Sequence, residues 1–285
     1  MSDSRWQDKL FVAVQQWLPT RALSRLMYSL TRIEWPAFKN AHIKLFMQGF
    51  DISLAEAEYP NAEDYPTFND FFTRALKPGA RPLDTDARAF LSPVDGTVSQ
   101  AGTIRAGRIF QAKGIDYSAE DLLGGDASAF MNGSFATIYL APYNYHRIHM
   151  PAAGKLRDWN LVPGRLFSVN PATVRTLPGV FARNERLCAT FETSSGSMAM
   201  VLVGALFVGS IETVWSGQVT PPHIRSGGDR YQPMRPVALE RGAEMGRFNM
   251  GSTVILLTPP GAVRWDERLQ PGSTLRVGER IGTRG

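Results

Sequence analysis

The stretch Met198-Ala199-Met200-Val201-Leu202-Val203-Gly204-Ala205-Leu206-Phe207-Val208-Gly209-Ser210-Ile211 is the longest uncharged apolar run in the chain. It is rich in residues that favour strands, and Gly204 and Gly209 divide it into short pieces. A helix that crosses a bilayer needs about 20 consecutive apolar residues, and no stretch of this sequence approaches that length. The run therefore predicts buried β-strands rather than a membrane span.

The same pattern continues on both sides of this run, from about Leu91 to the C-terminus. Short apolar stretches alternate with Gly, Pro and Asn, which is typical of a sandwich or barrel. The predicted strands include Gly96–Val98, Phe135–Leu140, Cys188–Glu192, Met198–Val203, Leu206–Thr213 and Thr253–Leu257. Strands and helices do not alternate, and no glycine-rich phosphate loop precedes a helix, so nucleotide-dependent chemistry finds no support.

The first 85 residues have a different, helical pattern. Apolar residues recur every three or four positions over Trp6–Leu18, and again after Pro19, where Thr20 could cap a second helix. A third helix is predicted over Trp35–Met47, and a short one over Thr67–Leu76 within a turn-rich bridge. We therefore expect an α+β protein, with a helical segment and bridge over 1–85 and a β-rich, sandwich- or barrel-like core over 86–285.

Charge is concentrated in the helical segment. The 285 residues carry a net charge of +5, and residues 1–48 account for +4 of it, with seven basic and three acidic residues. The nearly neutral remainder argues against a surface that binds nucleic acid. Basic helices with Trp and Leu on one face suit an anionic bilayer surface, and Arg21, Arg25 and Arg32 can share one side of the second helix. Alternatively, these helices pack on the body with solvated basic faces.

Candidate chemical groups occur in three short motifs. His146 and His149 lie in Tyr145-His146-Arg147-Ile148-His149-Met150-Pro151, and a pair this close is typical of acid–base or metal chemistry, or of a structural pair. Asp95 lies in a turn motif, Ser92-Pro93-Val94-Asp95-Gly96-Thr97, and Ser252 follows Gly251 at the entrance of a predicted strand. The single cysteine excludes a disulfide framework and a Cys-rich zinc site, and no nearby carboxylate cluster would complete a metal site on the histidines.

Taken together and in this order, the motifs resemble the phosphatidylserine decarboxylase proenzymes, which are pyruvoyl-dependent enzymes that make phosphatidylethanolamine. The resemblance covers nearly the whole chain. Besides the three motifs above, it rests on Phe71-Phe72-Thr73-Arg74, Pro163-Gly164-Arg165-Leu166-Phe167-Ser168-Val169-Asn170, Phe181-Ala182-Arg183-Asn184-Glu185-Arg186, Gly209-Ser210-Ile211-Glu212-Thr213-Val214-Trp215 and Glu244-Met245-Gly246-Arg247-Phe248. One departure is Met250, where the family usually has Leu, and the similar volume of the two side chains predicts little effect.

The resemblance implies a self-processing site. Asp95, His149 and Ser252 would form the charge-relay triad that cleaves the chain between Gly251 and Ser252, leaving a β chain (1–251) and an α chain (252–285) as a heterodimer. Ser252 would become a covalent pyruvoyl group, the pyruvate cofactor, which forms a Schiff base with the amine of phosphatidylserine. His146 is then the candidate proton donor in decarboxylation, and no metal is expected.

The resemblance also implies a location and partners. The expected partners are phosphatidylserine and an anionic membrane surface, with the protein peripheral on the cytoplasmic side of the cell membrane; a higher homo-oligomer is left open. Two other hypotheses start from the same motifs: a zinc hydrolase that uses His146 and His149, and a non-catalytic β-sandwich that docks on membranes through its helices. Both predict an intact chain, whereas the decarboxylase predicts two fragments.

Overall fold

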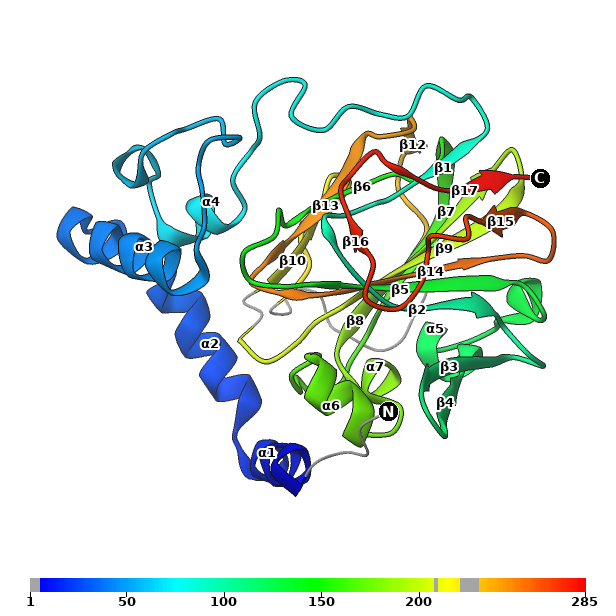
Figure 1. The fold of residues 1–285 in the computed structure, drawn as a ribbon, viewed down its shortest axis with the longest axis horizontal. Coiled ribbons are helices and arrows are strands. Elements are labelled where there is room, and N and C mark those ends of the chain that lie inside the picture. Colours follow the sequence, from blue (N-terminus) through cyan, green and yellow to red (C-terminus); the bar gives the residue numbers. More distant parts are fainter. Residues whose placement is uncertain (1–5, 208–209, 221–230) are drawn as a thin grey trace.

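The computed structural model describes residues 6–207, 210–220 and 231–285, and it sets the N-terminal helices to one side of a β-rich body (Figure 1). The helices are α1 (Trp6–Trp17), α2 (Thr20–Leu30), α3 (Pro36–Phe50), α4 (Phe68–Phe72), α5 (Ala119–Leu123), α6 (Pro171–Thr176) and α7 (Val180–Arg183). Short 3₁₀ turns occur at Ala62–Asp64 and Ser128–Phe130. The strands are β1 (Ala89–Leu91), β2 (Gly96–Thr103), β3 (Arg108–Ala112), β4 (Ile115–Ser118), β5 (Ser134–Leu140), β6 (Arg147–His149), β7 (Gly154–Val162), β8 (Arg186–Thr193), β9 (Gly196–Val203), β10 (Ser210–Thr213), β11 (Gly217–Gln218), β12 (Ala238–Leu239), β13 (Glu244–Asn249), β14 (Ser252–Thr258), β15 (Val263–Trp265), β16 (Thr274–Leu275) and β17 (Arg280–Arg284).

The body is built on an eight-stranded antiparallel sheet in the order β12-β7-β8-β9-β14-β5-β2-β16. Strand β14 lies inside this sheet, where it pairs with β5 on one side and β9 on the other. All seven of its residues are buried. Because strand side chains alternate between the two faces, Val254 and Leu256 join one hydrophobic cluster while Ile255 and Leu257 join another.

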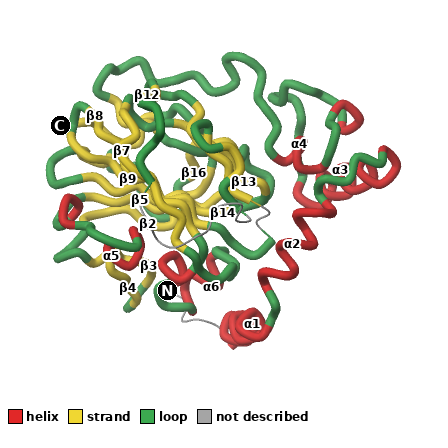
Figure 2. Tube along the Cα trace, turned by 180° about the vertical axis from the view of Figure 1, so that it is seen from behind, coloured by secondary structure: helices red, strands yellow, loops and turns green. Residues whose placement is uncertain are grey.

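Further layers cover both faces of this sheet. Two smaller sheets, β1-β17-β15 and β11-β10-β13-β6, contribute Phe90, Ile148 and Phe248 to the cluster on the first face. Helices α5 to α7 and the β3–β4 hairpin contribute residues such as Leu122 to the second. Figure 2 shows the strands gathered into one body with the N-terminal helices beside it.

The α+β class is confirmed, and the layered sheets agree with a sandwich, but the barrel-like alternative is wrong. Among the described residues, the large sheet does not close on itself and ends in the two-residue strands β12 and β16. The added layers bury its faces, so closure is not needed to shield them from water. None of the helices in the described ranges has the length and apolarity required to cross a membrane.

Individual elements differ from the sequence predictions mainly at their ends. Thr20 does not cap α2; it is the first helical residue and is buried, and Pro19 precedes it. The predicted helix Thr67–Leu76 shortens to α4, whose N-cap is Thr67. Of the predicted strand Leu206–Thr213, only Ser210–Thr213 forms β10; residues 208 and 209 lie outside the described ranges.

The N-terminal segment has a small core of its own. Ile43 of α3 and the phenylalanines of α4, which are Phe68, Phe71 and Phe72, form a buried cluster with residues of the bridge. Met250, directly before the Gly251–Ser252 bond, packs against this cluster. The helical segment therefore contacts the main chain next to the predicted cleavage point.

Candidate active site

Ser252 is the first residue of β14, as the sequence predicted, and only 1% of its surface is exposed. Its Oγ has no hydrogen-bond partner among the described residues. The backbone before it is strained, because Met250 has φ +96°, a region that side-chain-bearing residues rarely adopt. A buried hydroxyl without a partner, next to a strained turn, is available for a reaction.

His149 ends β6 with both ring nitrogens engaged. Its Nδ1 lies 2.8 Å from the carbonyl oxygen of Gly242, which only accepts hydrogen bonds, so Nδ1 carries the proton. The Nε2 of the neutral ring is then an acceptor, and it receives the hydroxyl of Tyr145 at 3.0 Å. Burial lowers the pKa of His149, although the Gly242 bond and the charge of Glu244 oppose this. The ring is therefore a neutral base.

His146 is fully buried and also neutral. Its Nδ1 donates to the carbonyl oxygen of Asn144 at 2.8 Å, while Nε2 has no partner among the described residues. The ring of Phe72 lies 4.1 Å away, centroid to centroid. Burial lowers the pKa of His146 to about 3, and the nearby charge of Arg74 adds to this lowering. In this state His146 offers a free lone pair rather than a proton.

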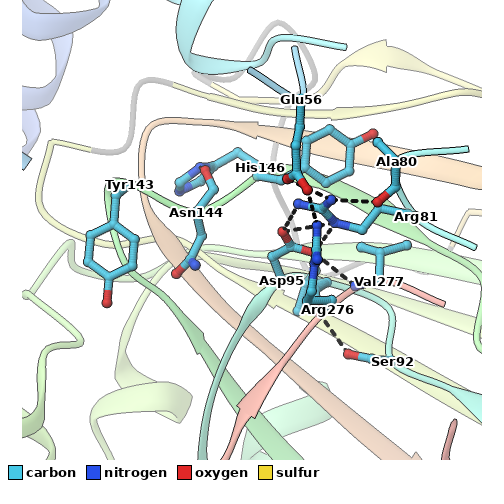
Figure 3. A network of polar contacts seen from close by, with 12 residues as sticks. Glu56, Ala80, Arg81, Ser92, Asp95, Tyr143, Asn144, His146, Arg276 and Val277 are labelled. Carbon is cyan, nitrogen blue, oxygen red and sulfur yellow. Dashed lines mark hydrogen bonds and ion pairs between the residues drawn. The ribbon is translucent and has the colours of Figure 1, made fainter. Parts of the chain in front are cut away.

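Asp95 lies in the bend before β2, and its carboxylate is held by neighbours other than His149. Arg81 donates to it from Nε at 2.9 Å and from Nη2 at 2.6 Å, and the Val277 amide donates at 2.8 Å. Arg81 also donates to the carboxylate of Glu56, at 2.9 Å, and Arg276 forms an ion pair with Glu56 as well (Figure 3).

Of the predicted triad, Asp95 and His149 lie close enough for the charge of Asp95 to act on the imidazole, but in the described part of the chain no continuous hydrogen-bond chain joins the three residues. No hydrogen bond between Asp95 and His149 exists in the described part of the chain. The link between them is indirect, since the His149 amide donates to the carbonyl of Pro93 at 2.8 Å and the charge of Asp95 acts on the pKa of His149. Where a triad would place a carboxylate at Nδ1, the structure has the Gly242 carbonyl.

Sequence reasoning missed the groups that hold these side chains. Tyr145 stood in the same motif as the two histidines, so its spacing from His149 was a usable signal. Arg81 precedes Pro82 in the turn-rich bridge, where no local pattern indicates an ion pair with Asp95. Gly242 carried no signal, because its part is played by a main-chain carbonyl. Within the described ranges, no three His, Cys, Asp or Glu side chains gather as metal ligands would.

The fold and the site define a class of protein: an α+β protein with a buried serine, a buried neutral imidazole and a second, half-buried one, which are the groups used in nucleophilic and proton-transfer catalysis. Comparison with known proteins narrows this class. The sequence pattern of the phosphatidylserine decarboxylase family matches residues 68–283, and a second pattern, described as PSD, matches residues 10–51.

Similar curated proteins cover almost the whole chain. The phosphatidylserine decarboxylase proenzyme of Alcanivorax borkumensis is 53% identical over 97% of this chain and 96% of its own. Those of Bordetella avium and Stutzerimonas stutzeri are 52% and 53% identical over 96% and 97% of this chain and 95% of their own. The chain belongs to the phosphatidylserine decarboxylase family and is a decarboxylase.

Proposed function

We propose that this chain converts phosphatidylserine to phosphatidylethanolamine and carbon dioxide, using a pyruvoyl group that it makes from its own Ser252. The relatives are named proenzymes, which agrees with a chain that must be processed. The observation that carries the proposal is the Ser252 hydroxyl, which lies buried at the first residue of a central strand and has no partner in the part of the chain that the structure describes. This is the group that processing requires.

Processing would begin with attack of Ser252 Oγ on the carbonyl carbon of Gly251. An unassisted hydroxyl is a weak nucleophile, and neutral His149 is the base that would take its proton. Since His149 Nε2 already accepts from Tyr145, that hydroxyl must leave or pass the proton on. The negative charge of Asp95 favours the protonated imidazole that results.

The cleaved chains would remain together. Residues 252–258 are hydrogen-bonded between β5 and β9, and the Val277 amide holds Asp95 of the longer chain. The Arg276–Glu56 ion pair adds a second link across the cut. These contacts support the heterodimer of β chain 1–251 and α chain 252–285.

His146 would serve the chemistry that follows. A pyruvoyl ketone supplies a sink for the electrons left when carbon dioxide departs. Overall, the reaction takes up one proton, which must reach the substrate carbon. His146 Nε2 is free to carry it, and a substrate carboxylate nearby would raise the low pKa of His146. Once the carboxylate has left as carbon dioxide, protonated His146 is again a strong acid.

Mass spectrometry of the purified protein tests the proposal. We expect a fragment of residues 252–285 with a blocked N-terminus and a mass below that of the same peptide starting with serine. Asp95→Asn and His149→Ala should remain largely uncleaved, as should the Ser252→Ala control. His146→Ala should cleave but lose decarboxylation. An ordinary serine N-terminus at position 252 would rule out the pyruvoyl mechanism.

We also propose that α1, α2 and α3 rest on an anionic membrane surface, on the cytoplasmic side of the cell membrane. The support is an inverted burial pattern. Toward the body, α1 and α2 bury mainly polar side chains: Gln15, which contacts Thr173 and Ser168, together with Thr20 and Ser24. Alongside polar and basic residues, the three helices expose many large apolar ones, which include Trp6, Leu10, Phe11, Val14, Trp17, Leu26, Leu45 and Phe50.

The predicted basic face is only partly available for lipid. Arg21 donates to the carbonyl of Gly164, and Arg32 donates to Ser210, so both help to dock α2 on the body. Arg25 is exposed. An exposed apolar surface of this kind suits insertion at the headgroup boundary, and it argues against the alternative in which these helices pack on the body with solvated basic faces.

A further inference from the structure

Arg74 is a buried cation that the proposed reaction does not use. It closes the Phe71-Phe72-Thr73-Arg74 motif directly after α4, and only 6% of its surface is exposed. Its side-chain hydrogen bonds go to the carbonyls of Phe71 and Tyr143, at 3.5 and 3.3 Å. In the described ranges, no carboxylate lies within ion-pair distance of it. Since buried charges are ordinarily paired, this arginine is a candidate group for binding an anion.

Arg74 lines a cavity of about 170 Å³ beside the candidate active site. Tyr143, Asn144 and Tyr145 form part of the same wall, and Figure 3 shows Tyr143, Asn144 and His146 grouped on one side of the Asp95–Arg81 pair. Asn144 is also the partner of His146, whose pKa the charge of Arg74 lowers. The loop before β6 therefore lines the cavity and also carries His146.

The lining of this cavity carries three carboxylates, Asp51, Glu56 and Asp95, and two arginines, of which Arg74 has no ion-pair partner in the described part of the chain. The other arginine in its lining, Arg81, is shared between the carboxylates of Asp95 and Glu56. The charge of Asp95 acts on Arg74 as well, but burial dominates and lowers the pKa of Arg74. The guanidinium of Arg74 is desolvated and has N–H groups that the two carbonyls do not use. An anion in the cavity could therefore accept strong, charge-assisted hydrogen bonds from it.

We propose that Arg74 binds the phosphodiester of the lipid substrate. This inference rests on the proposed function, because it takes phosphatidylserine as the substrate. The substrate has two anionic groups, the carboxylate and the phosphodiester, and the chemistry of decarboxylation favours the phosphodiester as the partner of Arg74. An arginine on the carboxylate would stabilise the ground state of a group that must leave as neutral carbon dioxide, which raises the barrier. The phosphodiester keeps its charge throughout, so binding it costs nothing in the chemical step.

Two small ligands distinguish binding of the phosphodiester from binding of the carboxylate. Dihexanoyl phosphatidylethanolamine, the short-chain product, carries the phosphodiester without the carboxylate. O-hexyl-L-serine carries the carboxylate and amine without phosphate. Inhibition constants for both, and the KM for dihexanoyl phosphatidylserine, would be measured on the mature wild type, Arg74→Met, Arg74→Lys and the surface control Arg157→Met.

Arg74→Met should weaken binding of the product and raise the KM for the substrate by about tenfold or more, as expected for a charge-assisted hydrogen bond. The loss should be confined to ligands that carry phosphate. Arg74→Lys, which keeps the charge but not the planar fork, should fall in between. Arg157→Met should match the wild type, because Arg157 lies on the surface of β7 in a pair with Asp158.

Two further readouts separate a binding role from a structural one. Removing an unpaired buried charge should leave the thermal unfolding temperature of Arg74→Met unchanged or higher, and cleavage at Ser252 should proceed. If Arg74→Met unfolds at a lower temperature and binds neither ligand, the role of Arg74 is structural. If only the binding of O-hexyl-L-serine is lost, Arg74 binds the substrate carboxylate instead of the phosphodiester. Unchanged product binding in a cleaved, folded Arg74→Met would overturn the assignment and leave the proposed function standing. A wild type that does not cleave would overturn the proposed function itself.

Discussion

At the scale of single residues, the protonation states of the two histidines follow from main-chain carbonyls. Gly242 and Asn144 each accept from an Nδ1–H, which leaves both Nε2 atoms as lone pairs. Burial then keeps both rings neutral by lowering their pKa values. The two sites differ in what faces Nε2, which is the Tyr145 hydroxyl for His149 and no described partner for His146.

Tyr145→Phe should change the pH dependence of self-cleavage. Burial raises the pKa of Tyr145 to about 12, so its hydroxyl remains a donor and stabilises neutral His149. Without that donor the pKa of His149 rises, and the acid limb of the cleavage-rate profile moves to higher pH. Glu244, Arg147 and Asp95 also act on His149 and stay in place.

The plateau of the same profile reports on proton transfer. If Tyr145 passes the proton of Ser252 to His149, the maximal cleavage rate should fall by at least about tenfold, which is the low end for general acid–base groups. Tyr59→Phe, a change at an exposed tyrosine, is the control. A profile of Tyr145→Phe that superimposes on the wild type would show that this hydroxyl only fills space.

His146 should make the protein sensitive to acid. Its pKa falls from 6.5 in the unfolded chain to about 3 in the fold, so the unfolded state binds more protons between these values. The stability that neutral His146 contributes is complete above pH 6.5 and is lost as the pH falls toward 3. On uncleaved Ser252→Ala protein, His146→Gln should reduce the acid-induced drop in unfolding temperature by about 2–4 °C per pH unit. Parallel curves with and without His146 would contradict this.

At the scale of elements, β14 and the turn before it combine rigidity with strain. The strand is fully buried between two partners, and its first residue is Ser252. The strain lies at Met250 rather than at Gly251, where a side chain would meet only the Leu140 carbonyl, at 3.9 Å. The buried strand on one side and the packed Met250 on the other hold the residues that flank the Gly251–Ser252 bond in place.

Relief of that strain should slow cleavage. Both Met250→Ala and Met250→Gly lose the contact with the N-terminal cluster, but only glycine adopts φ +96° without cost. We therefore expect Met250→Gly to cleave more slowly than Met250→Ala, by about fivefold for about 1 kcal/mol of strain. Gel time courses after cell-free synthesis measure both rates. Equal rates would mean that the strain does not assist the reaction.

At the scale of the whole molecule, the exposed apolar surface of α1 to α3 predicts vesicle binding that survives high salt. Trp17 is 90% exposed and Leu26 is 57% exposed. Trp17→Ser with Leu26→Ser should lower binding to anionic vesicles by about tenfold or more, because two large apolar side chains lose their burial in lipid. Cleavage at Ser252 should continue, since these residues do not contact the site.

Charge and apolar burial can be separated in the same co-sedimentation assay. Arg25→Glu should weaken binding at low salt and have little effect at high salt, where electrostatic attraction is screened. Phe110→Ser, at an exposed apolar residue of β3 on the body, is the matched control and should bind as the wild type does. If Trp17→Ser with Leu26→Ser sediments with vesicles like the wild type, the helices do not dock on lipid.

The sequence by itself determined the class of fold, the family and the position of Ser252 at the start of a strand. These follow from local patterns: apolar stretches of strand length between turn residues, helical spacing before residue 50, and motifs in a fixed order. Local patterns could not predict whether the large sheet closes into a barrel, because closure depends on which layers cover the faces of the sheet. Local spacing likewise could not show that Thr20 faces the body inside the first turn of α2 rather than capping it.

The tertiary structure alone decided how the candidate site is held. Arg81 and Val277 reach Asp95 from positions 14 residues before it and 182 residues after it, and Gly242 reaches His149 across 93 residues. Which groups are left without a partner is decided in the same way, since it depends on every neighbour that folding brings near. Arg74 became a candidate only because folding buried its charge without a carboxylate partner among the described residues, and no local pattern records that outcome.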